Sequence, residues 1–294
     1  MEWIQKSLRK EELSMHYILE AINLFQKMFV LLYRCLAVVL LTRFVSCAHS
    51  HSSSSGNHTV HSLYGPTQFM KHAQSLPVVS DKTQTHGYHE MYGLFLLPLI
   101  QRKHRVKEKV KFFEIGLGCN FNASSVGLWK SLLNSRDEIW MAELSHRCIE
   151  NYKASGQLDG INVVEGDQGE VGTIKEWAKI IGPNIDVIVD DGSHQNHAIS
   201  NTFHGLWESL APGGLYFVED MVLLNHSYKD KYGSFFLDYI ASWNRQLALW
   251  GSFQGKESLD EPFPLPHRLK WVFCQAEACV FAKCSLEDTS ICAD

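Results

Sequence analysis

The sequence predicts an α/β fold with a Rossmann-like, doubly wound and mostly parallel sheet that an antiparallel strand closes. Three observations lead to this prediction. Short apolar runs alternate with segments of helical spacing from about residue 109 onward, the first run ends in a glycine turn, and two further apolar runs follow near the C-terminus. Strands and helices that alternate in this way form a parallel sheet covered by helices on both faces.

Each element follows from the periodicity of its own segment. The apolar runs predict strands at 110–115, 138–143, 161–165, 186–190 and 215–219. Helical spacing predicts helices at 126–133, 146–154, 171–181 and about 197–210, and the Pro-Gly-Gly sequence at 212–214 ends the last of them. We expect an aromatic helix at 234–250, with most of its rings in the core, and a closing antiparallel pair at 271–274 and 279–282.

The chain divides into four expected regions: a helical, apolar leader at 1–48, a linker rich in Ser and His at 49–75, a catalytic domain at 76–286 and a tail at 287–294. A His-rich tract can bind metal, but no Cys or carboxylate is interleaved with these histidines, which favours a solvated linker. Asn57, Asn122 and Asn225 begin glycosylation sequons, which matter only if the chain enters the secretory pathway.

Residues 28–48 are compatible with more than one cellular location of the chain. They are apolar and about long enough to span a bilayer, but Arg34 and Arg43 interrupt them. The run between these arginines suits a signal peptide, and Ser-Cys-Ala at 46–48 resembles a cleavage site. Helical apolar spacing at 15–29 favours instead an amphipathic or buried helix. Secretory targeting or membrane association through residues 28–48 therefore stands beside a cytoplasmic location.

Composition and cysteine usage exclude several classes of protein. A hydrophobic content of 45% excludes a disordered chain, and a net charge of -5 argues against a dedicated nucleic-acid binder. The eight cysteines form no Cys-x-x-Cys pair, which disfavours a zinc ribbon. For Cys274, Cys279, Cys284 and Cys292, disulfides in an oxidising compartment and buried free thiols both remain open. We expect Cys119 to be present for its size.

Glycines and acids recur at the carboxyl ends of the predicted strands, where doubly wound sheets bind ligands. Gly116 and Gly118 permit a positive φ and a close approach to the backbone. Glu143 is placed to accept hydrogen bonds from two ribose hydroxyls, and Asp167 to hold an adenine amino group. Phe121 stands where the NAD fingerprint needs a third glycine, which disfavours that cofactor. The expected cofactor-binding residues are Glu114, Gly116, Gly118, Glu143, Asp167 and Asp190.

A second acidic group follows the fourth and fifth predicted strands. Asp190 and Asp191 end the fourth strand with His194 close behind, and Glu219 and Asp220 end the fifth. Clustered carboxylates repel one another unless a cation or protons intervene. Oxygen ligands favour Mg²⁺ or Ca²⁺, whereas zinc favours Cys or more His. The sequence therefore predicts a hard divalent cation at this edge of the sheet.

The motifs resemble those of the class I S-adenosylmethionine-dependent methyltransferases. Glu-x-Gly-x-Gly at 114–118 precedes acids at 143 and 167, with Asn120 in the place of the usual third glycine. Asp-Asp-Gly-Ser-His at 190–194, followed by Glu-Asp-Met at 219–221, is similar to the metal-dependent sugar O-methyltransferases of the macrocin and mycinamicin type. Ser-Asp-Lys at 80–82, with His86, Tyr88 and Tyr92, resembles the entry segment of that family. The likeness runs over about residues 79–221.

This resemblance implies a Mg²⁺-assisted, S-adenosylmethionine-dependent O-methyltransferase. It implies that Asp191, Glu219 and Asp220 ligate Mg²⁺ and that His194 is the general base. The expected partner is a small molecule that offers a hydroxyl of a sugar, a glycoside or another vicinal diol such as a catechol, and no nucleic acid. Two alternatives remain, an iron-dependent oxygenase similar to the cephalosporin hydroxylases, which share the Asp-Gly-Ser-His pattern, and a non-catalytic binding protein on the same fold.

Overall fold

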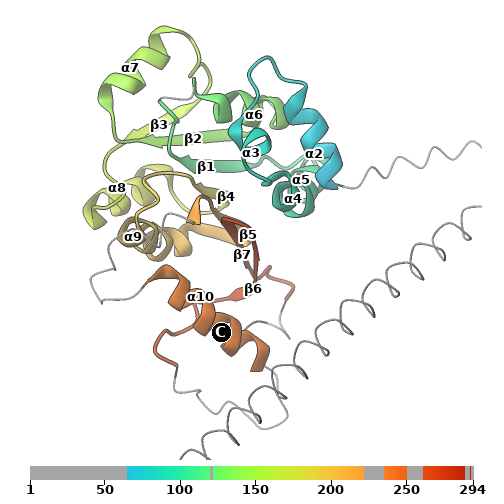
Figure 1. Cartoon of the computed structure of the whole chain (residues 1–294), viewed down its shortest axis with the longest axis vertical. Helices are drawn as coiled ribbons and strands as arrows, with labels where there is room; N and C mark the ends of the chain where they lie inside the picture. The colour runs from blue at the N-terminus through green and yellow to red at the C-terminus, as the bar shows by residue number, and fades with distance from the viewer. Residues whose placement is uncertain (1–64, 120–121, 222–234, 250–260, 289–291, 293–294) are drawn as a thin grey trace, which may run out of the picture. The chain divides into compact units, whose positions relative to one another are not determined.

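A mixed sheet forms the centre of the computed structural model, which describes residues 65–119, 122–221, 235–249, 261–288 and 292 (Figure 1). Its strands are β1 (Lys111–Ile115), β2 (Glu138–Glu143), β3 (Asn162–Glu165), β4 (Ile185–Asp190), β5 (Leu210–Val218), β6 (Leu269–Gln275) and β7 (Ala278–Lys283). They lie in the order β3-β2-β1-β4-β5-β7-β6. β1 to β5 are parallel, whereas β7 is antiparallel to both β5 and β6. The predicted α/β fold with an antiparallel closing strand is confirmed.

Helices cover both faces of the sheet. Those before β1 are α2 (Gly65–Gln74), α3 (Asp81–Gln84), α4 (His89–Met91), a π-helical turn η1 (Tyr92–Leu96) and α5 (Leu97–Arg105). The crossover helices are α6 (Ser124–Leu132), α7 (His146–Ala154), α8 (Val171–Ile181) and α9 (Asn196–Leu206), followed by a 3₁₀ turn η2 (Trp207–Ser209). α10 (Phe236–Leu249) lies between β5 and β6 in the chain.

Two hydrophobic cores lie on the two faces of the sheet because successive strand residues point in opposite directions. Phe112 belongs to the core with α2, α5 and α6, and its neighbour Phe113 to the core with α8, α9 and α10. Each core is centred on aromatic side chains that water does not reach, among them Trp129 and Trp243. Burial of a large apolar side chain contributes about 1.5–3 kcal/mol, so these rings stabilise both layers.

The order of the strands reverses at β1, which places a ligand crevice at its carboxyl end. Ile115, the last residue of β1, pairs with Ala142 on β2 and with Asp190 on β4. The connections after β1 and β4 therefore leave the sheet side by side and diverge. Ligands of doubly wound folds bind at this kind of switch point.

The segment before β1 differs from the predicted linker. Residues 65–74, assigned to the linker, form α2, with Phe69 and Ala73 fully buried. The Phe69 ring stacks on Tyr92 with a centroid separation of 5.3 Å. Apolar residues three to four positions apart form a helical face, and the polar tract before them hides this pattern. The leader at 1–48 lies outside the described residues, and none of the described helices is long and apolar enough to cross a membrane.

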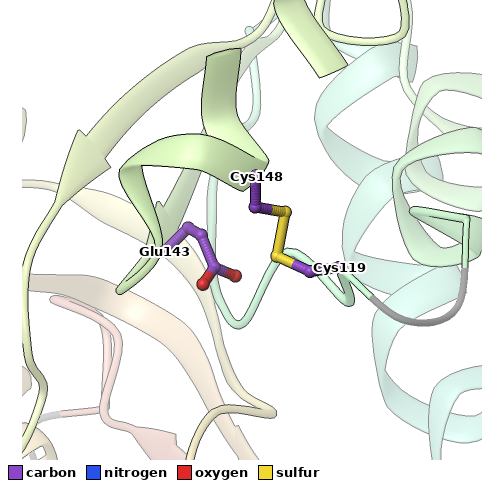
Figure 2. A group of neighbouring side chains, drawn as sticks. All are labelled: Cys119, Glu143 and Cys148. Atoms are coloured by element: carbon purple, nitrogen blue, oxygen red, sulfur yellow. A yellow bond between two sulfur atoms is a disulfide. The ribbon is translucent and has the colours of Figure 1, made fainter. Parts of the chain in front are cut away.

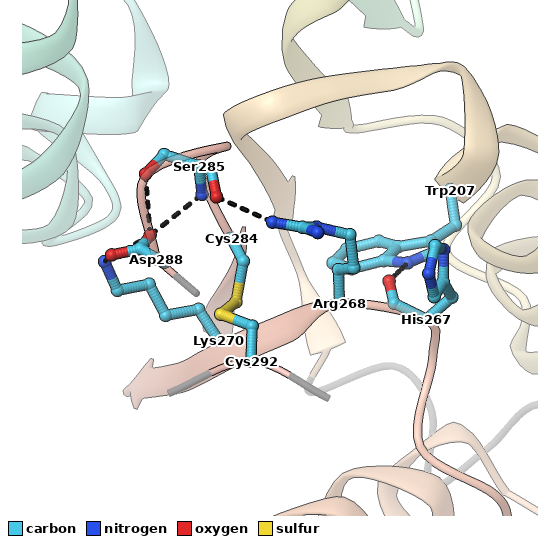
Figure 3. The surroundings of a disulfide bond; sticks show 8 residues. All are labelled: Trp207, His267, Arg268, Lys270, Cys284, Ser285, Asp288 and Cys292. Carbon is cyan, nitrogen blue, oxygen red and sulfur yellow. Dashed lines mark hydrogen bonds and ion pairs between the residues drawn. A yellow bond between two sulfur atoms is a disulfide. The ribbon is translucent and has the colours of Figure 1, made fainter. Parts of the chain in front are cut away.

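Disulfides join all four C-terminal cysteines, whose state the sequence left open. Cys274 and Cys279 face each other across the β6–β7 hairpin. Cys284, directly after β7, is bonded to Cys292 in the tail (Figure 3). Asp288 adds an ion pair with Lys270 at 2.8 Å and accepts a hydrogen bond from the Ser285 amide, also at 2.8 Å. The predicted tail is thereby fastened to the end of the sheet.

Candidate functional site

The loop after β1 lies directly against the end of β4. Gly116 has a φ of +102° and Gly118 a φ of +69°, both in the region that favours glycine. A Cβ atom on Gly116 would lie 2.1 Å from the backbone oxygen of Asp191, so no larger residue fits there. The two glycines therefore form a tight turn packed against the loop after β4, and both line the cleft described below.

Glu143 lies at the end of β2, where two neighbouring segments hold its carboxylate. The Leu117 amide of the glycine loop donates to Oε2 at 3.3 Å, and the Ser145 amide at the start of α7 donates to Oε1 at 2.8 Å. A disulfide between Cys119 and Cys148 joins these same two segments beside Glu143 (Figure 2). The prediction that Cys119 serves only for its size is therefore wrong.

Asp167, after β3, is exposed, and its Oδ1 accepts a hydrogen bond from the Gly169 amide at 2.7 Å. Its neighbour Gln168 is buried and connects the cofactor side to the acidic side of the site. The side-chain nitrogen Nε2 of Gln168 donates to Oδ1 of Asp190 at 3.0 Å. The side-chain oxygen Oε1 of Gln168 accepts a hydrogen bond from the backbone amide of Ser193 at 2.6 Å. Gln168 thus fixes the loop that carries Asp191 and His194, a role that no sequence motif indicated.

Two predicted cofactor contacts lie behind the site instead of within it. Asp190 is 1% exposed and accepts hydrogen bonds from Thr202 and Gln168. Glu114 is fully buried and accepts a hydrogen bond from Ser125 at 2.8 Å. Burial raises the pKa of Asp190 and raises that of Glu114 to about 7, against the opposing pull of Lys82 on Glu114. Neither carboxyl lines the cleft described below: Glu114 bonds to Ser125 of α6, and Asp190 bonds to Thr202 of α9.

One cleft of about 660 Å³ collects most of the other predicted residues at the carboxyl ends of the strands. Its lining includes the predicted residues Gly116, Gly118, Glu143, Asp167, Asp191, His194 and Asp220. Asp81, His86, Gln168 and Trp177 also line it, without having been assigned a role from the sequence. Cofactor-type and metal-type residues therefore share one cavity.

Three of the cleft residues bring ligand atoms within 4.8 Å of one another: Asp191, His194 and Asp220. Nε2 of His194 lies 3.7 Å from Oδ2 of Asp220, and its Nδ1 is buried with no hydrogen-bond partner among the described residues. His194 and Asp220 both adopt a left-handed conformation, with φ of +55° and +52°. Non-glycine residues in this conformation are costly and concentrate at functional sites.

Glu219, the third predicted metal ligand, is not part of this group. It is 1% exposed, and it accepts hydrogen bonds from Tyr92 and, at 2.5 Å, from Lys82. Burial raises the pKa of Glu219 well above its ordinary value, although the Lys82 ammonium acts in the opposite direction. In this structure Glu219 is a partner of Lys82, and its role as a metal ligand stays a prediction.

Lys82 is a buried cation at the centre of the acidic residues. Its Nζ lies 2.7 Å from Asp191, 2.5 Å from Glu219 and 3.4 Å from Glu114. Burial alone would lower the pKa of Lys82, but the three carboxylates outweigh burial and hold this pKa well above its ordinary value. The only signal for Lys82 in the sequence was its place in the Ser-Asp-Lys segment at 80–82.

The remaining wall of the site comes from the segment between α3 and η1. The Tyr88 hydroxyl donates to Oδ1 of Asp220 at 2.5 Å and accepts from the Asp220 amide at 3.1 Å. Burial, together with the bond to Asp220, raises the pKa of Tyr88 above its ordinary value. His86 stacks on Tyr88 and forms a 2.7 Å hydrogen bond with Glu277 in the β6–β7 turn. Tyr88 thereby holds Asp220 in its left-handed conformation.

Comparison with known proteins gives the same assignment for the fold. No family model matches the chain. The MycE methyltransferase of mycinamycin biosynthesis, solved with Mg, SAH and mycinamycin VI, superposes with a TM-score of 0.56 over 78% of this chain and 57% of that chain, at 20% identity. This chain has a class I methyltransferase fold.

Curated relatives of this chain include sugar O-methyltransferases. They confirm the resemblance to the macrocin and mycinamicin type that the sequence motifs indicated. Demethylmacrocin O-methyltransferase of Streptomyces fradiae is 33% identical over 124 residues, 41% of this chain and 29% of the relative. Mycinamicin VI 2''-O-methyltransferase of Micromonospora griseorubida is 29% identical over 119 residues, 39% of this chain and 28% of the relative. The matches span less than a third of these relatives' length.

Proposed function

We propose that this chain is an S-adenosylmethionine-dependent O-methyltransferase, assisted by Mg²⁺, that methylates a hydroxyl of a sugar, a glycoside or another vicinal diol. The observation that carries the proposal is the single cleft in which the glycine loop and Glu143 face Asp191, His194 and Asp220. The names of the relatives, which are O-methyltransferases of sugar-bearing compounds, support the same reaction.

The residues of the cleft fit the cofactor. Its volume lies in the range of small-molecule pockets. Gly116 and Gly118 leave the backbone open, the Glu143 carboxylate has free lone pairs for two ribose hydroxyls, and the exposed Asp167 is available to an adenine amino group. Glu114 and Asp190 would support this pocket from behind without touching the cofactor.

The donor set also fits a hard divalent cation. Asp191 and Asp220 offer carboxylate oxygens, the type of ligand that Mg²⁺ prefers. Three acids of this region, Glu114, Asp191 and Glu219, share one buried cation, Lys82, and Asp220 lies beside them with no ammonium partner among the described residues. Bound Mg²⁺ would supply charge neutralisation and polarise the acceptor hydroxyl. Glu219 would join the ligands only by exchanging its contacts with Lys82 and Tyr92.

The chemistry that this chain must supply is the positioning of the acceptor and the removal of one proton. The acceptor oxygen attacks the methyl carbon of S-adenosylmethionine in line with the carbon–sulfur bond. The oxygen–carbon bond forms while the carbon–sulfur bond breaks, and the sulfur leaves as the thioether of S-adenosylhomocysteine. His194 accepts the hydroxyl proton at Nε2, because the ring nitrogen of a neutral imidazole can act as a general base. Asp220, 3.7 Å from Nε2, stabilises the imidazolium that forms.

Product mass spectrometry tests the proposal. The protein would be incubated with S-adenosylmethionine, Mg²⁺ and a panel of glycosides and catechols, without iron and without oxygen. We expect one acceptor class to gain one methyl group, EDTA to suppress this gain and added Mg²⁺ to restore it. A requirement for iron and oxygen would contradict the proposal and favour the oxygenase alternative, and the absence of turnover with intact cofactor binding would favour the binding-protein alternative.

A further inference from the structure

The Cys119–Cys148 disulfide lies at the cofactor end of the cleft, where none of the chemistry above uses it (Figure 2). Cys119 directly follows Gly118 in the glycine loop, and Cys148 lies in the first turn of α7. Their Cα atoms are 5.8 Å apart, within the usual range for a disulfide. The bond therefore joins two segments that the chain connects only through α6 and β2.

These two segments are the ones that hold Glu143. The glycine loop donates the Leu117 amide to one carboxylate oxygen, and the start of α7 donates the Ser145 amide to the other. A second contact joins the same segments, because the Tyr152 hydroxyl of α7 donates to the backbone oxygen of Cys119 at 3.1 Å. Separation of the loop from α7 would remove one of the two donors from Glu143.

We propose that the Cys119–Cys148 disulfide is a positioning cross-link of the cofactor pocket, which holds the glycine loop against α7 so that Glu143 keeps its orientation toward the ligand. This proposal rests on the proposed function for the identity of that ligand. A loop that is ordered in advance loses less freedom on binding, so the cross-linked form binds more tightly.

Formation of this bond requires an oxidant. The two thiols lose two protons and two electrons, and one molecule of a small disulfide such as oxidised glutathione accepts them and becomes two thiols. Such bonds persist in oxidising compartments and are rare in the cytosol. All six described cysteines are in disulfides: one pair at the cofactor end of the cleft and two pairs at the β6–β7 hairpin and the segment after it. We therefore expect the cross-linked form in an oxidising compartment.

Calorimetry with S-adenosylhomocysteine on the full chain, purified without reductant, measures the effect on affinity. The Cys119→Ser/Cys148→Ser variant should bind about tenfold more weakly than the wild type. The Cys274→Ser/Cys279→Ser variant, which removes a disulfide from the β6–β7 hairpin, should keep the wild-type affinity. Equal affinity of the first variant and the wild type would overturn the cross-link's role and leave the proposed function intact, whereas a wild type that does not bind would overturn both.

A redox titration tests the same claim on the wild-type chain and does not depend on the folding of a variant. The protein is equilibrated in mixtures of reduced and oxidised glutathione, thiols are alkylated, and peptides are quantified by mass spectrometry. Binding and oxidation must favour each other by the same factor. Saturating S-adenosylhomocysteine should therefore shift the midpoint of Cys119–Cys148 about tenfold toward the oxidised form and leave Cys274–Cys279 unchanged. An unchanged midpoint, or both thiols free in the fully oxidised protein, would overturn the proposal.

Discussion

The two halves of the cleft are built in different ways. The cofactor half consists of a glycine turn and single acids at the ends of β1, β2 and β3, held by hydrogen bonds that span between 2 and 26 residues of the chain. The acidic half depends on Lys82, which meets Asp191 from 109 residues away and Glu219 from 137 residues away. Local backbone geometry determines the first half, and buried charge pairing determines the second.

This difference has a consequence for the effect of mutations. A substitution in the cofactor half should change ligand binding with little effect on folding, because its side chains are partly exposed. A substitution in the acidic half should affect folding as well, because removal of one partner leaves a buried charge unpaired. His194 is an exception, since it lies in the acidic half but has few contacts to lose.

The largest expected effect is on turnover. His194→Ala should lower methyl transfer by about 100-fold to 10,000-fold, the usual contribution of a general base, and retain binding of S-adenosylhomocysteine. His72→Ala is the control, because the His72 ring bonds to the Ser131 hydroxyl, outside the cleft, and this variant should keep full activity. Methyl transfer at the wild-type rate by His194→Ala would exclude this histidine as the base.

The next effect is on stability. Lys82→Met should lower the free energy of unfolding by about 3–5 kcal/mol, because it leaves buried carboxylates without their cation. Urea unfolding at neutral pH measures this change. Lys270→Met removes an ammonium from a partly exposed pair with Asp288 and should cost no more than about 1 kcal/mol. Similar losses for the two variants would show that the charges around Lys82 do not form a buried network.

A smaller effect is a pH dependence from Glu114. Its pKa is raised by burial to about 7 in the folded chain, from 4.5 as the reference value. The folded state therefore binds more protons between these two values, and stability falls as pH rises through this window, by about 3 kcal/mol for this shift. Glu114→Gln should make this slope shallower in urea unfolding measured with EDTA, and Glu219 and Asp190, whose pKa values burial also raises, account for the slope that remains. The same slope in variant and wild type would assign the titration to another group.

How much of the molecule the sequence could predict depends on the range of the contacts involved. β2, α7 and α8 have the predicted bounds because their apolar periodicity is local. β5 begins at Leu210, five residues before the prediction, because Pro212 and the glycines after it form an irregularity within the strand instead of the break that was expected. Gly116, Gly118, Glu143 and Asp167, singled out at the strand ends, line the cleft, and their binding of a cofactor stays a prediction.

Contacts between distant segments were not predictable in this way. Nothing near Glu219 in the chain indicates that Lys82 and Tyr92 occupy its oxygens. The helices from α3 to α5 were missed because they acquire their burial from the sheet, which their own short segments do not reveal. The pairing of Cys119 with Cys148 likewise depends on how β1 and β2 bring their following segments together.

The central claim is that one cleft holds the cofactor and the metal in separate halves. Calorimetry with S-adenosylhomocysteine and with Mg²⁺, on Glu143→Ala and on Asp191→Asn, tests this claim most directly. Glu143→Ala should weaken S-adenosylhomocysteine by about 10-fold to 100-fold and leave Mg²⁺ affinity unchanged, because hydrogen bonds to a charged group contribute about 1.5–3 kcal/mol. Asp191→Asn should weaken Mg²⁺ and leave S-adenosylhomocysteine bound as in the wild type. Unchanged affinities in both variants would contradict the assignment of the cleft.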